Sequence, residues 1–442
     1  MTGLPRYLIL DPNAATMPKP ALRERQATRL RAMVRYVYDN TDFWRRKFEA
    51  AGLTPDDIRG LDDLRRVPFC TKAELLDDQL RNPPFGSYVG SHPTHWYKMF
   101  STSGSTGRPL WRVFSSGDWD NVLDRLHRSA PFLPGDRVMV LAPVDGLMGP
   151  TAAAEGASRR GAMVIHAGRF DTRTKVDLIQ QFRPTYVMGA ASYMLHVAEI
   201  AREMGVDLAA QGVRFLTSVG EPGAAIPATR DRLARRWGAT IGDGFGLTEI
   251  FPLGGSCPHS VALHIPDDLV ITEIVDPDSG KPLPPGEPGE VVFTNLISDT
   301  QPLLRYRTRD VARTADDTPC ACGFTGTLLV NSIEGRVDDM IWYKGINLFP
   351  SAIESVLRGF DDAGDEFQIV MRGSDASPVL VIRVEPRSPT STQGDWPKRL
   401  QAAIKAKLKV RAVVELASRG SLPKADAGIK ARRFVDERNT SR

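Results

Sequence analysis

Apolar and charged residues alternate at helical spacing through much of the first hundred residues. The segment ALRERQATRLRAMVRYVYDN, residues 21–40, follows this pattern along its whole length. In TKAELLDDQL, residues 71–80, Thr71 can cap a helix that follows Pro68 and Phe69. The amino-terminal part is therefore predicted to be mainly helical.

From Arg137 the pattern changes to short apolar runs that are separated by helical segments. The runs include RVMVLAP, AMVIHA, TYVMG and VRFLTSVG, and the helical segments include MLHVAEIAREMG and ATRDRLARRWG. This alternation indicates βαβ units and a largely parallel sheet, so the predicted fold class is α/β.

Two regions with different patterns of apolar, Gly and Pro residues follow. After Asp268, LVITEIVDPDSGKPLPPGEPGEVVFTNL contains two strand-like runs joined by a Gly- and Pro-rich turn, which predicts a β-rich subdomain. From about Met340, the strand-like QIVMRG and PVLVIRVEP precede the helical WPKRLQAAIKAKLKV. The end of the chain is therefore predicted to be a small α+β domain.

Composition narrows the class of protein. The chain has 442 residues, of which 42% are hydrophobic and 25% charged, and this length favours two to four domains. The net charge is +4, and no long basic tract occurs outside the last dozen positions, so we do not expect a nucleic-acid partner. The start, MTGLPRYLILDPN, lacks a signal-peptide pattern, and no stretch approaches 18 apolar residues. We expect a soluble cytoplasmic protein with no membrane partner, and a homodimer stays open.

Seven consecutive Ser, Thr and Gly residues, Ser101–Gly107, lie between two strand-like runs and precede Arg108 and Pro109. Such a loop presents backbone N–H groups and hydroxyls that can surround an anion, and this suits phosphates. It is not a P-loop, because it lacks the GxxxxGK[ST] spacing and Pro109 prevents a helix from starting directly after it. A flexible surface hairpin is the alternative interpretation.

Five motifs together resemble a known family. In order and spacing, STSGSTGRP, SVGEP, GDGFGLTE, RYRTRD and GRVDDMIWYKGINLFPSAIE are similar to the motif series of the adenylate-forming acyl-CoA synthetase superfamily. PFCTKAELLDD and NLFPSAIE resemble its phenylacetate-CoA ligase and aryl-CoA ligase branch. The resemblance covers about residues 60–436 and implies use of ATP, Mg²⁺ and coenzyme A.

The resemblance implies roles that agree with the chemistry of the residues. Activating a carboxylate brings two anions together, so the site must neutralise a triphosphate. Phe245, beside Gly246, can stack on adenine, Thr248 can contact the α-phosphate, and Glu249 can bind Mg²⁺ through oxygen. The residues assigned to the β- and γ-phosphates are Ser101, Thr102, Ser103, Gly104, Ser105, Thr106, Gly107 and Arg108.

Four more residues are assigned to the nucleotide. Gly220 and Glu221 would form the wall beside adenine, Asp310 would accept from the ribose hydroxyls, and Arg336 would contact ribose or phosphate. Without the resemblance, core packing is the ordinary interpretation for a lone Phe, and solvation is the ordinary one for a surface Asp or Arg.

The resemblance also implies a division into two domains. Residues 1–337 would form the adenylation core, and residues 338–442 a mobile domain that turns about a hinge at Asp338 between two reactions. Gly345 would line a narrow tunnel for the pantetheine of coenzyme A, with a turn glycine as the alternative.

The catalytic lysine stands in an altered motif. The family has Lys directly after Gly, whereas this chain reads LPKADAGIKARRFVDER, with Ile429 between Gly428 and Lys430. Counting back from ARRFVD makes Lys430 the match, and Lys424 is the alternative.

The chain has four cysteines, too few for a disulfide scaffold at this length. Cys257, Cys320 and Cys322 with one histidine would make a closed structural Zn²⁺ site, and free core cysteines are the alternative. His264 is preferred over His259, because LHIPDD resembles the branch pattern. Cys70 is expected to be a buried thiol.

We therefore expect an enzyme that converts a small aromatic carboxylate to an acyl-adenylate and passes the acyl group to a thiol, coenzyme A. The small residues of DGLMGPTAAAEGA, residues 145–157, would leave room for the ring. One alternative is a different acceptor or acid: a carrier protein, an amine, or nitrite for diazotisation of an aryl amine. A second is a nucleotide-binding regulator without catalysis, against which Glu249 and Asp310 argue.

Overall fold

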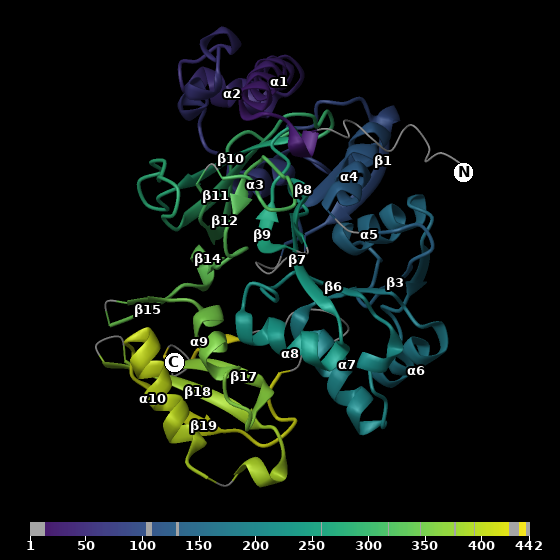
Figure 1. Ribbon diagram of the computed structural model, residues 1–442. Coiled ribbons are helices and arrows are strands. Elements are labelled where there is room, and N and C mark those ends of the chain that lie inside the picture. Colours follow the sequence, from purple (N-terminus) through teal and green to yellow (C-terminus); the bar gives the residue numbers. More distant parts are fainter. Residues whose placement is uncertain are drawn as a thin grey trace. The chain divides into compact units, whose positions relative to one another are not determined.

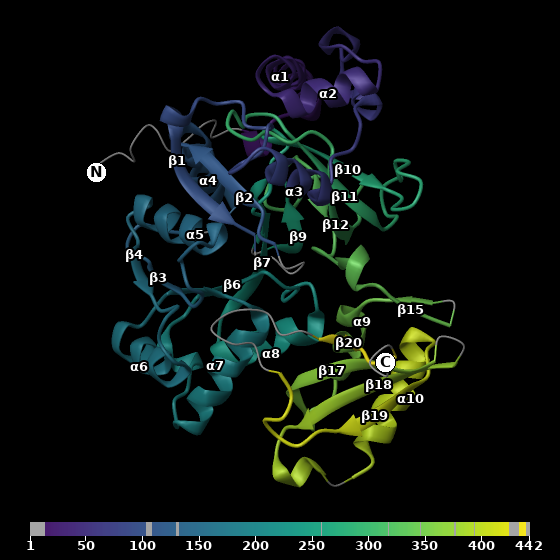
Figure 2. The ribbon, with the colours of Figure 1, turned by 180° about the vertical axis from the view of Figure 1, so that it is seen from behind.

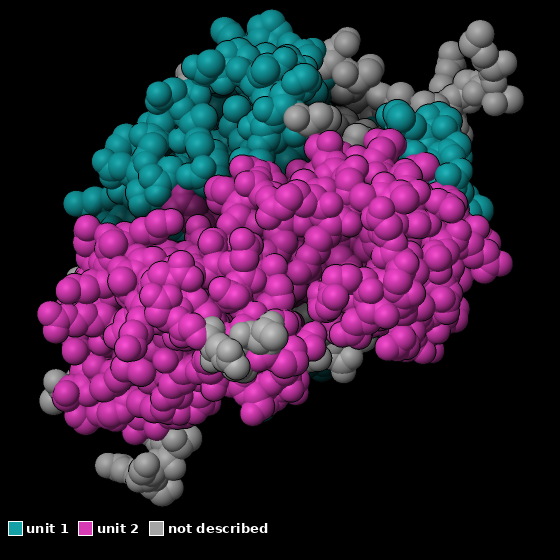
Figure 3. Space-filling view, turned by 60° about the horizontal axis from the view of Figure 1, so that its bottom comes forward, with its two compact units in different colours: residues 1–166, 244–332 teal, residues 167–243, 333–442 magenta. Residues whose placement is uncertain are grey.

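The computed structural model describes residues 14–102, 108–129, 132–257, 259–316, 318–344, 346–374, 377–392, 394–423 and 433–438. The chain divides into two compact units, residues 1–166 with 244–332 and residues 167–243 with 333–442 (Figure 3). The expected boundary at 337/338, with its hinge at Asp338, falls inside the second unit. That domain division stays a prediction.

The first unit begins with the expected helices. They are α1 (Lys19–Asn40), α2 (Asp42–Ala50) and α3 (Lys72–Arg81). Thr71 caps α3 as predicted: its hydroxyl accepts from the Glu74 N–H at 3.3 Å, and its own N–H donates to the Glu74 carboxylate at 2.8 Å. This reciprocal pair satisfies two backbone donors and fixes where the helix begins.

Strands and helices alternate through the rest of the first segment of this unit. The elements are β1 (Trp96–Ser101), β2 (Trp111–Ser115), α4 (Ser116–Ser129), β3 (Arg137–Val140), α5 (Met148–Arg159) and β4 (Met163–His166). Strands β1 and β2 pair antiparallel, and β3 and β4 pair parallel. The predicted parallel pairing is confirmed for β3 and β4, whose connection is helical.

The second segment of the first unit is β-rich, as expected after Asp268. Strands β10 (Val270–Val275), β11 (Gly289–Asn295) and β12 (Tyr306–Ala312) form an antiparallel sheet in which every residue of β11 is buried. Before them, β8 (Phe251–Cys257) and β9 (Ser260–His264) form a hairpin, and β13 (Leu328–Leu329) pairs with β9. These last pairings are antiparallel.

The second unit contains the remaining βαβ elements. They are α6 (Thr172–Phe182), β5 (Tyr186–Gly189), α7 (Ala191–Glu203), β6 (Phe215–Val219), α8 (Pro227–Trp237) and the first half of β7 (Thr240–Leu247). Strands β5 and β6 pair parallel. Strand β7 crosses from the second unit into the first, where its end pairs antiparallel with β8.

The predicted α+β domain is also present in this unit. Its four-stranded sheet has the order β19-β18-β17-β20, and α9 and α10 cover one face (Figures 1 and 2). Alternate residues of β17 and β18, such as Ile369 and Ile382, meet Leu357 and Ile404 of the helices in a buried core. The elements are β14 (Gly335–Arg336), β15 (Ile341–Tyr343), β16 (Ile346–Leu348), α9 (Pro350–Leu357), β17 (Ala363–Ser374), β18 (Ser377–Pro386), α10 (Trp396–Leu408), β19 (Ala412–Leu416) and β20 (Phe434–Asp436).

Short 3₁₀ helices connect several of these elements. They are Ala14–Thr16, Pro55–Asp57, Leu61–Arg66, Pro93–His95, Ala209–Gln211, Val337–Asp339 and Pro389–Thr392. Within the described ranges, no helix combines the length and the apolar character needed to cross a bilayer.

Candidate nucleotide and metal sites

Two hydrogen bonds between Thr102 and Leu110 close the base of the Ser/Thr/Gly loop, which joins β1 to β2. Thr102 is buried; its N–H donates to the Leu110 carbonyl, and its hydroxyl accepts from the Leu110 N–H, both at 3.0 Å. Ser101 pairs with Trp111, and Arg108 is exposed at the end of the loop. Ser103–Gly107 lie outside the described residues. The hydrogen bonds of Thr102 with Leu110 hold the two ends of the loop together, which suits a closed anion-binding turn.

Thr248 and Glu249 occupy the turn between β7 and β8. The Ile250 N–H donates to the Leu247 carbonyl at 3.2 Å, which closes the turn. Thr248 is half-buried and Glu249 is 7% exposed. The Lys72 ammonium nitrogen lies 3.2 Å from Glu249 Oε1. A buried carboxylate with hard oxygen atoms is a suitable Mg²⁺ ligand, so the predicted role fits its position.

Two other groups surround Glu249. The Tyr306 hydroxyl hydrogen-bonds to its carboxylate, and burial together with the Glu249 charge raises the pKa of Tyr306 well above its ordinary value. Arg112, 2% exposed, also interacts with the Glu249 charge and donates to the Gln301 carbonyl at 2.5 Å. Burial lowers the pKa of Arg112, and the neighbouring Tyr88, Glu249 and Tyr306 oppose that shift. The carboxylate therefore lies among cations and a donor.

Two more predicted nucleotide residues lie in the same unit. Phe245 is half-buried in β7, and its ring centroid is 6.3 Å from that of the fully buried Phe293. Gly246 follows at a bulge and is exposed. Asp310 is 5% exposed in β12, where its N–H donates to the Thr308 hydroxyl at 3.0 Å. Phe245 therefore packs against the buried Phe293 while part of its surface stays accessible, which fits a stacking platform.

The second unit holds Gly220 and Glu221 in the loop after β6. Gly220 has φ +83°, the left-handed region that favours glycine. Glu221 Oε1 accepts from the Ser192 N–H at 2.6 Å, and burial raises the pKa of Glu221. The loop is anchored by Asp243, whose carboxylate accepts three successive backbone N–H groups, from residues 223–225, at 3.2, 2.7 and 2.9 Å. Asp243 thus shapes the predicted adenine wall.

The remaining predicted positions divide into described and undescribed residues. Arg336 lies in β14 and donates to the carboxylate of Asp338, the expected hinge residue, at 3.1 Å. Gly345 and the two candidate lysines, Lys424 and Lys430, lie outside the described residues.

The four predicted zinc ligands come together. One ligand atom from each of Cys257, His264, Cys320 and Cys322 lies within 4.8 Å of all the others. The Cys257 and Cys320 sulfurs are 3.7 Å apart, and Cys322 Sγ is 3.3 Å from His264 Nε2. Two Zn–S bonds of about 2.3 Å at a tetrahedral angle place their sulfurs about 3.8 Å apart. The spacing fits a metal and is far longer than a disulfide bond.

The His264 ring is oriented for this role. Its Nδ1 lies 3.0 Å from the Ala262 carbonyl, which can only accept, so Nδ1 carries the proton and Nε2 is left as a ligand. Burial lowers the pKa of His264, which favours the neutral ring. His259 instead donates its backbone N–H to Cys257 Sγ at 3.4 Å. The geometry supports His264 over His259.

Three residues of these sites are not identified by sequence reasoning. The sequence pattern places Lys72 only in a capped helix, Tyr306 only in RYRTRD, and Asp243 only in GDGFGLTE. The position of each residue inside a motif marks it as a candidate functional residue. The sequence does not show its partners, because they lie at other places along the chain.

Two parts of the chain match known family models. The model described as "AMP-binding enzyme" matches residues 46–296, and "AMP-binding enzyme C-terminal domain" matches residues 345–438. The phenylacetate-coenzyme A ligase of Escherichia coli strain K12 is 31% identical, over 97% of this chain and 98% of that protein. The ligase of the same name from Thermus thermophilus is also 31% identical, over 98% of this chain and all of that protein.

A solved structure is similar over nearly the whole chain. It is 2-hydroxyisobutyryl-CoA ligase in the postadenylation state, with a TM-score of 0.92, 29% identity, and coverage of 99% of this chain and 95% of that one. The predicted α/β class and the predicted resemblance are both confirmed. The chain belongs to the AMP-binding enzyme family and is an AMP-forming ligase of the kind that includes the phenylacetate-coenzyme A ligases.

Proposed function

We propose that the protein uses ATP to convert a small aromatic carboxylate to an acyl-adenylate and then transfers the acyl group to coenzyme A. The observation that carries the proposal is the buried Glu249 carboxylate in the β7–β8 turn, flanked by Lys72 and Tyr306. In this role Glu249 binds Mg²⁺, which would neutralise phosphate charge, and Thr248 donates to the α-phosphate.

The other assigned residues keep their predicted nucleotide roles in this proposal. The loop after Thr102, together with Arg108, binds the terminal phosphates through N–H, hydroxyl and guanidinium groups. Lys430 contacts the carboxylate and the α-phosphate, where its ammonium stabilises charge that develops during adenylation. Adenine contacts Gly220, Glu221, Phe245 and Gly246; ribose contacts Asp310 and Arg336; Gly345 lines the coenzyme A tunnel.

The acid is inferred from two supports. The ligases of Escherichia coli and Thermus thermophilus, each 31% identical, are named for phenylacetate, an aromatic acid. Helix α5 contributes buried small residues, among them Ala152, Ala153 and Ala157, and in this proposal their small side chains border the acid pocket. The solved relative is named for 2-hydroxyisobutyrate, a branched aliphatic acid. A small aromatic acid is therefore the proposed class, and an aliphatic hydroxy acid is the competitor.

We also propose that Cys257, His264, Cys320 and Cys322 hold one structural Zn²⁺. Four protein ligands close the coordination shell, so the ion would fasten the 313–327 loop to the β8–β9 hairpin and take no part in the reaction.

Exchange of labelled pyrophosphate into ATP, with phenylacetate, benzoate, 2-hydroxyisobutyrate and nitrite as separate additions, tests the proposal. We expect exchange with an aromatic acid and, after coenzyme A is added, its thioester by mass spectrometry.

Glu249→Gln keeps the shape but removes the charge, so exchange should fall at least about tenfold at limiting Mg²⁺. Exchange with nitrite alone, or acyl transfer only to an amine or a carrier protein, would replace the proposed substrate. No exchange with any acid would leave the regulator interpretation.

A further inference from the structure

The side chain of Lys72 contacts Glu249, the proposed magnesium ligand, but the proposed reaction assigns no role to Lys72. Its ammonium nitrogen is 3.2 Å from Glu249 Oε1, and its side chain is 32% exposed while that of Glu249 is 9% exposed. The pair is thus open to solvent on the lysine side. A ligand that enters from solvent meets the ammonium first.

The backbone at Lys72 is held by two anchors. The capping pair of Thr71 and Glu74 sets the first turn of α3. Cys70 joins β12 at Tyr306: its N–H donates to the carbonyl of residue 305 at 3.0 Å, and its carbonyl accepts from the N–H of residue 307 at 2.9 Å. Such anchoring lets the Lys72 side chain move while its backbone stays in place.

Helix α3 also contacts β2, the strand that follows the phosphate loop in the sequence. Gln79 Nε2 donates to the Trp111 carbonyl at 2.6 Å, and Gln79 Oε1 accepts from the Trp111 N–H at 3.1 Å. Trp111 pairs with Ser101 at the root of that loop. One helix therefore carries both Lys72, which contacts Glu249, and Gln79, which contacts β2.

We propose that Lys72 is a further phosphate-binding residue of the ATP site, whose ammonium occupies the place of Mg²⁺ on Glu249 until the nucleotide arrives. This inference rests on the proposed function. Ammonium and Mg²⁺ are both cations that seek the same carboxylate oxygen, so they compete for it. A phosphate that shares a magnesium ion with Glu249 is a close neighbour of that carboxylate, because Mg–O bonds are about 2 Å long. The flexible lysine displaced from Glu249 can then pair with the phosphate.

The two halves of the proposal predict effects of opposite sign. When Lys72 is replaced, no ammonium group competes for the Glu249 carboxylate. A divalent ion should therefore bind more tightly to the nucleotide-free protein. ATP with Mg²⁺ should bind more weakly, because a charged contact to phosphate is lost. A residue that only supports the fold would weaken both.

The experiment compares wild type with Lys72→Met, Lys72→Arg and Lys47→Met. Lys47 of α2 pairs with Glu74 of α3, so its variant removes a cation that contacts α3 without touching Glu249. Binding of Mn²⁺ is measured by the electron paramagnetic resonance of the free ion, and binding of MgATP and AMP by calorimetry. For Lys72→Met we expect Mn²⁺ affinity to rise about tenfold, MgATP affinity to fall about tenfold and AMP affinity to stay within about threefold. Lys72→Arg should restore MgATP affinity in part, and Lys47→Met should match wild type.

The opposite results overturn the proposal in distinct ways. Unchanged Mn²⁺ affinity in Lys72→Met, or a gain that persists when Glu249→Gln is added, overturns the competition at Glu249. Equal MgATP affinity in wild type and Lys72→Met overturns the phosphate contact and leaves the proposed function standing. Wild-type protein that binds neither MgATP nor AMP overturns the proposed function and this inference together.

Discussion

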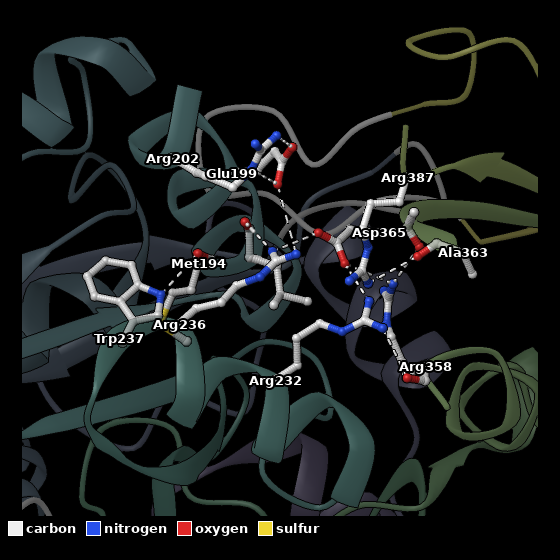
Figure 4. A network of polar contacts seen from close by, with 12 residues as sticks. Met194, Glu199, Arg202, Arg232, Arg236, Trp237, Arg358, Ala363, Asp365 and Arg387 are labelled. Atoms are coloured by element: carbon white, nitrogen blue, oxygen red, sulfur yellow. Dashed lines mark hydrogen bonds and ion pairs between the residues drawn. The ribbon is translucent and has the colours of Figure 1, made fainter. Parts of the chain in front are cut away.

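Arg232 Nη1 lies 2.8 Å from Asp365 Oδ1, although the two residues are 133 positions apart in the chain. Arg236 reaches the other oxygen of the same carboxylate at 2.9 Å, and Arg358 lies 3.5 Å from Oδ1 (Figure 4). Burial opposes ionisation, but the guanidinium groups of Arg358, Arg236 and Arg232 hold the pKa of Asp365 well below its ordinary value. Helix α8 is thereby joined to the start of β17 within the second unit.

Asp365→Asn should destabilise the second unit by about 3 kcal/mol, because it leaves several guanidinium groups without their shared counter-charge in a largely buried place. Urea unfolding gives the free energy, and hydrogen exchange of α8 and β17 locates the loss. Asp395→Asn is the control: its partner Arg399 is 60% exposed and Asp395 73% exposed, so the change should be under about 0.5 kcal/mol. Equal losses in the two variants would contradict this role of Asp365.

The purified protein should contain about one zinc per chain, because three thiolates and one correctly oriented imidazole converge within 4.8 Å. Metal analysis of wild type and Cys320→Ser checks this, with Cys70→Ser as a control because Cys70 is buried apart from the cluster. Loss of zinc in Cys320→Ser alone is the expected outcome. Negligible zinc in all three proteins would show that the cysteines are free thiols.

Lys430→Ala should slow adenylation about a hundredfold, roughly 3 kcal/mol, if its ammonium stabilises charge that develops only in the transition state. Transfer from supplied acyl-adenylate to coenzyme A should persist if residues 338–442 turn away in the second reaction, as the resemblance implies. Pyrophosphate release with saturating acid, followed by acyl transfer, separates the two steps. Lys424→Ala should lose much less. A strong loss in Lys424→Ala instead would move the catalytic assignment to that residue.

The free energy of unfolding should fall as the pH rises from about 4 to 7 because of Asp267. Burial raises its pKa to about 7, while the N–H and hydroxyl of Thr327 oppose that shift. The folded protein therefore holds a proton in this window that the unfolded chain, with a carboxyl pKa of about 4, has released. The loss is at most about 4 kcal/mol and is complete above pH 7.

Urea unfolding at pH 5 and pH 8 checks this, because Asp267→Asn should remove the difference between the two values. Asp276→Asn serves as the control: the pKa of the exposed Asp276 is lowered by hydrogen bonds from Ser279, so its titration lies below this window. A pH dependence that persists in Asp267→Asn would assign it to other groups.

The sequence by itself determined the local elements and the family. Helices α1 and α3, the Thr71 cap and strands β5, β6, β17 and β18 follow from spacing and capping, because these signals act over a few neighbouring residues. The ordered motifs also predicted the ligase class, which the relatives confirm. The nucleotide roles of single residues stay predictions.

Only the tertiary structure decided which distant side chains meet. The antiparallel pairing of β7, β8 and β9 brings Cys257 and His264 to one end, where the loop of Cys320 reaches them. The contact of Lys72 with Glu249 likewise joins a helix start to a turn far along the chain. No local pattern encodes such contacts, because each arises from the packing of separate elements and from charges that are paired once burial removes water.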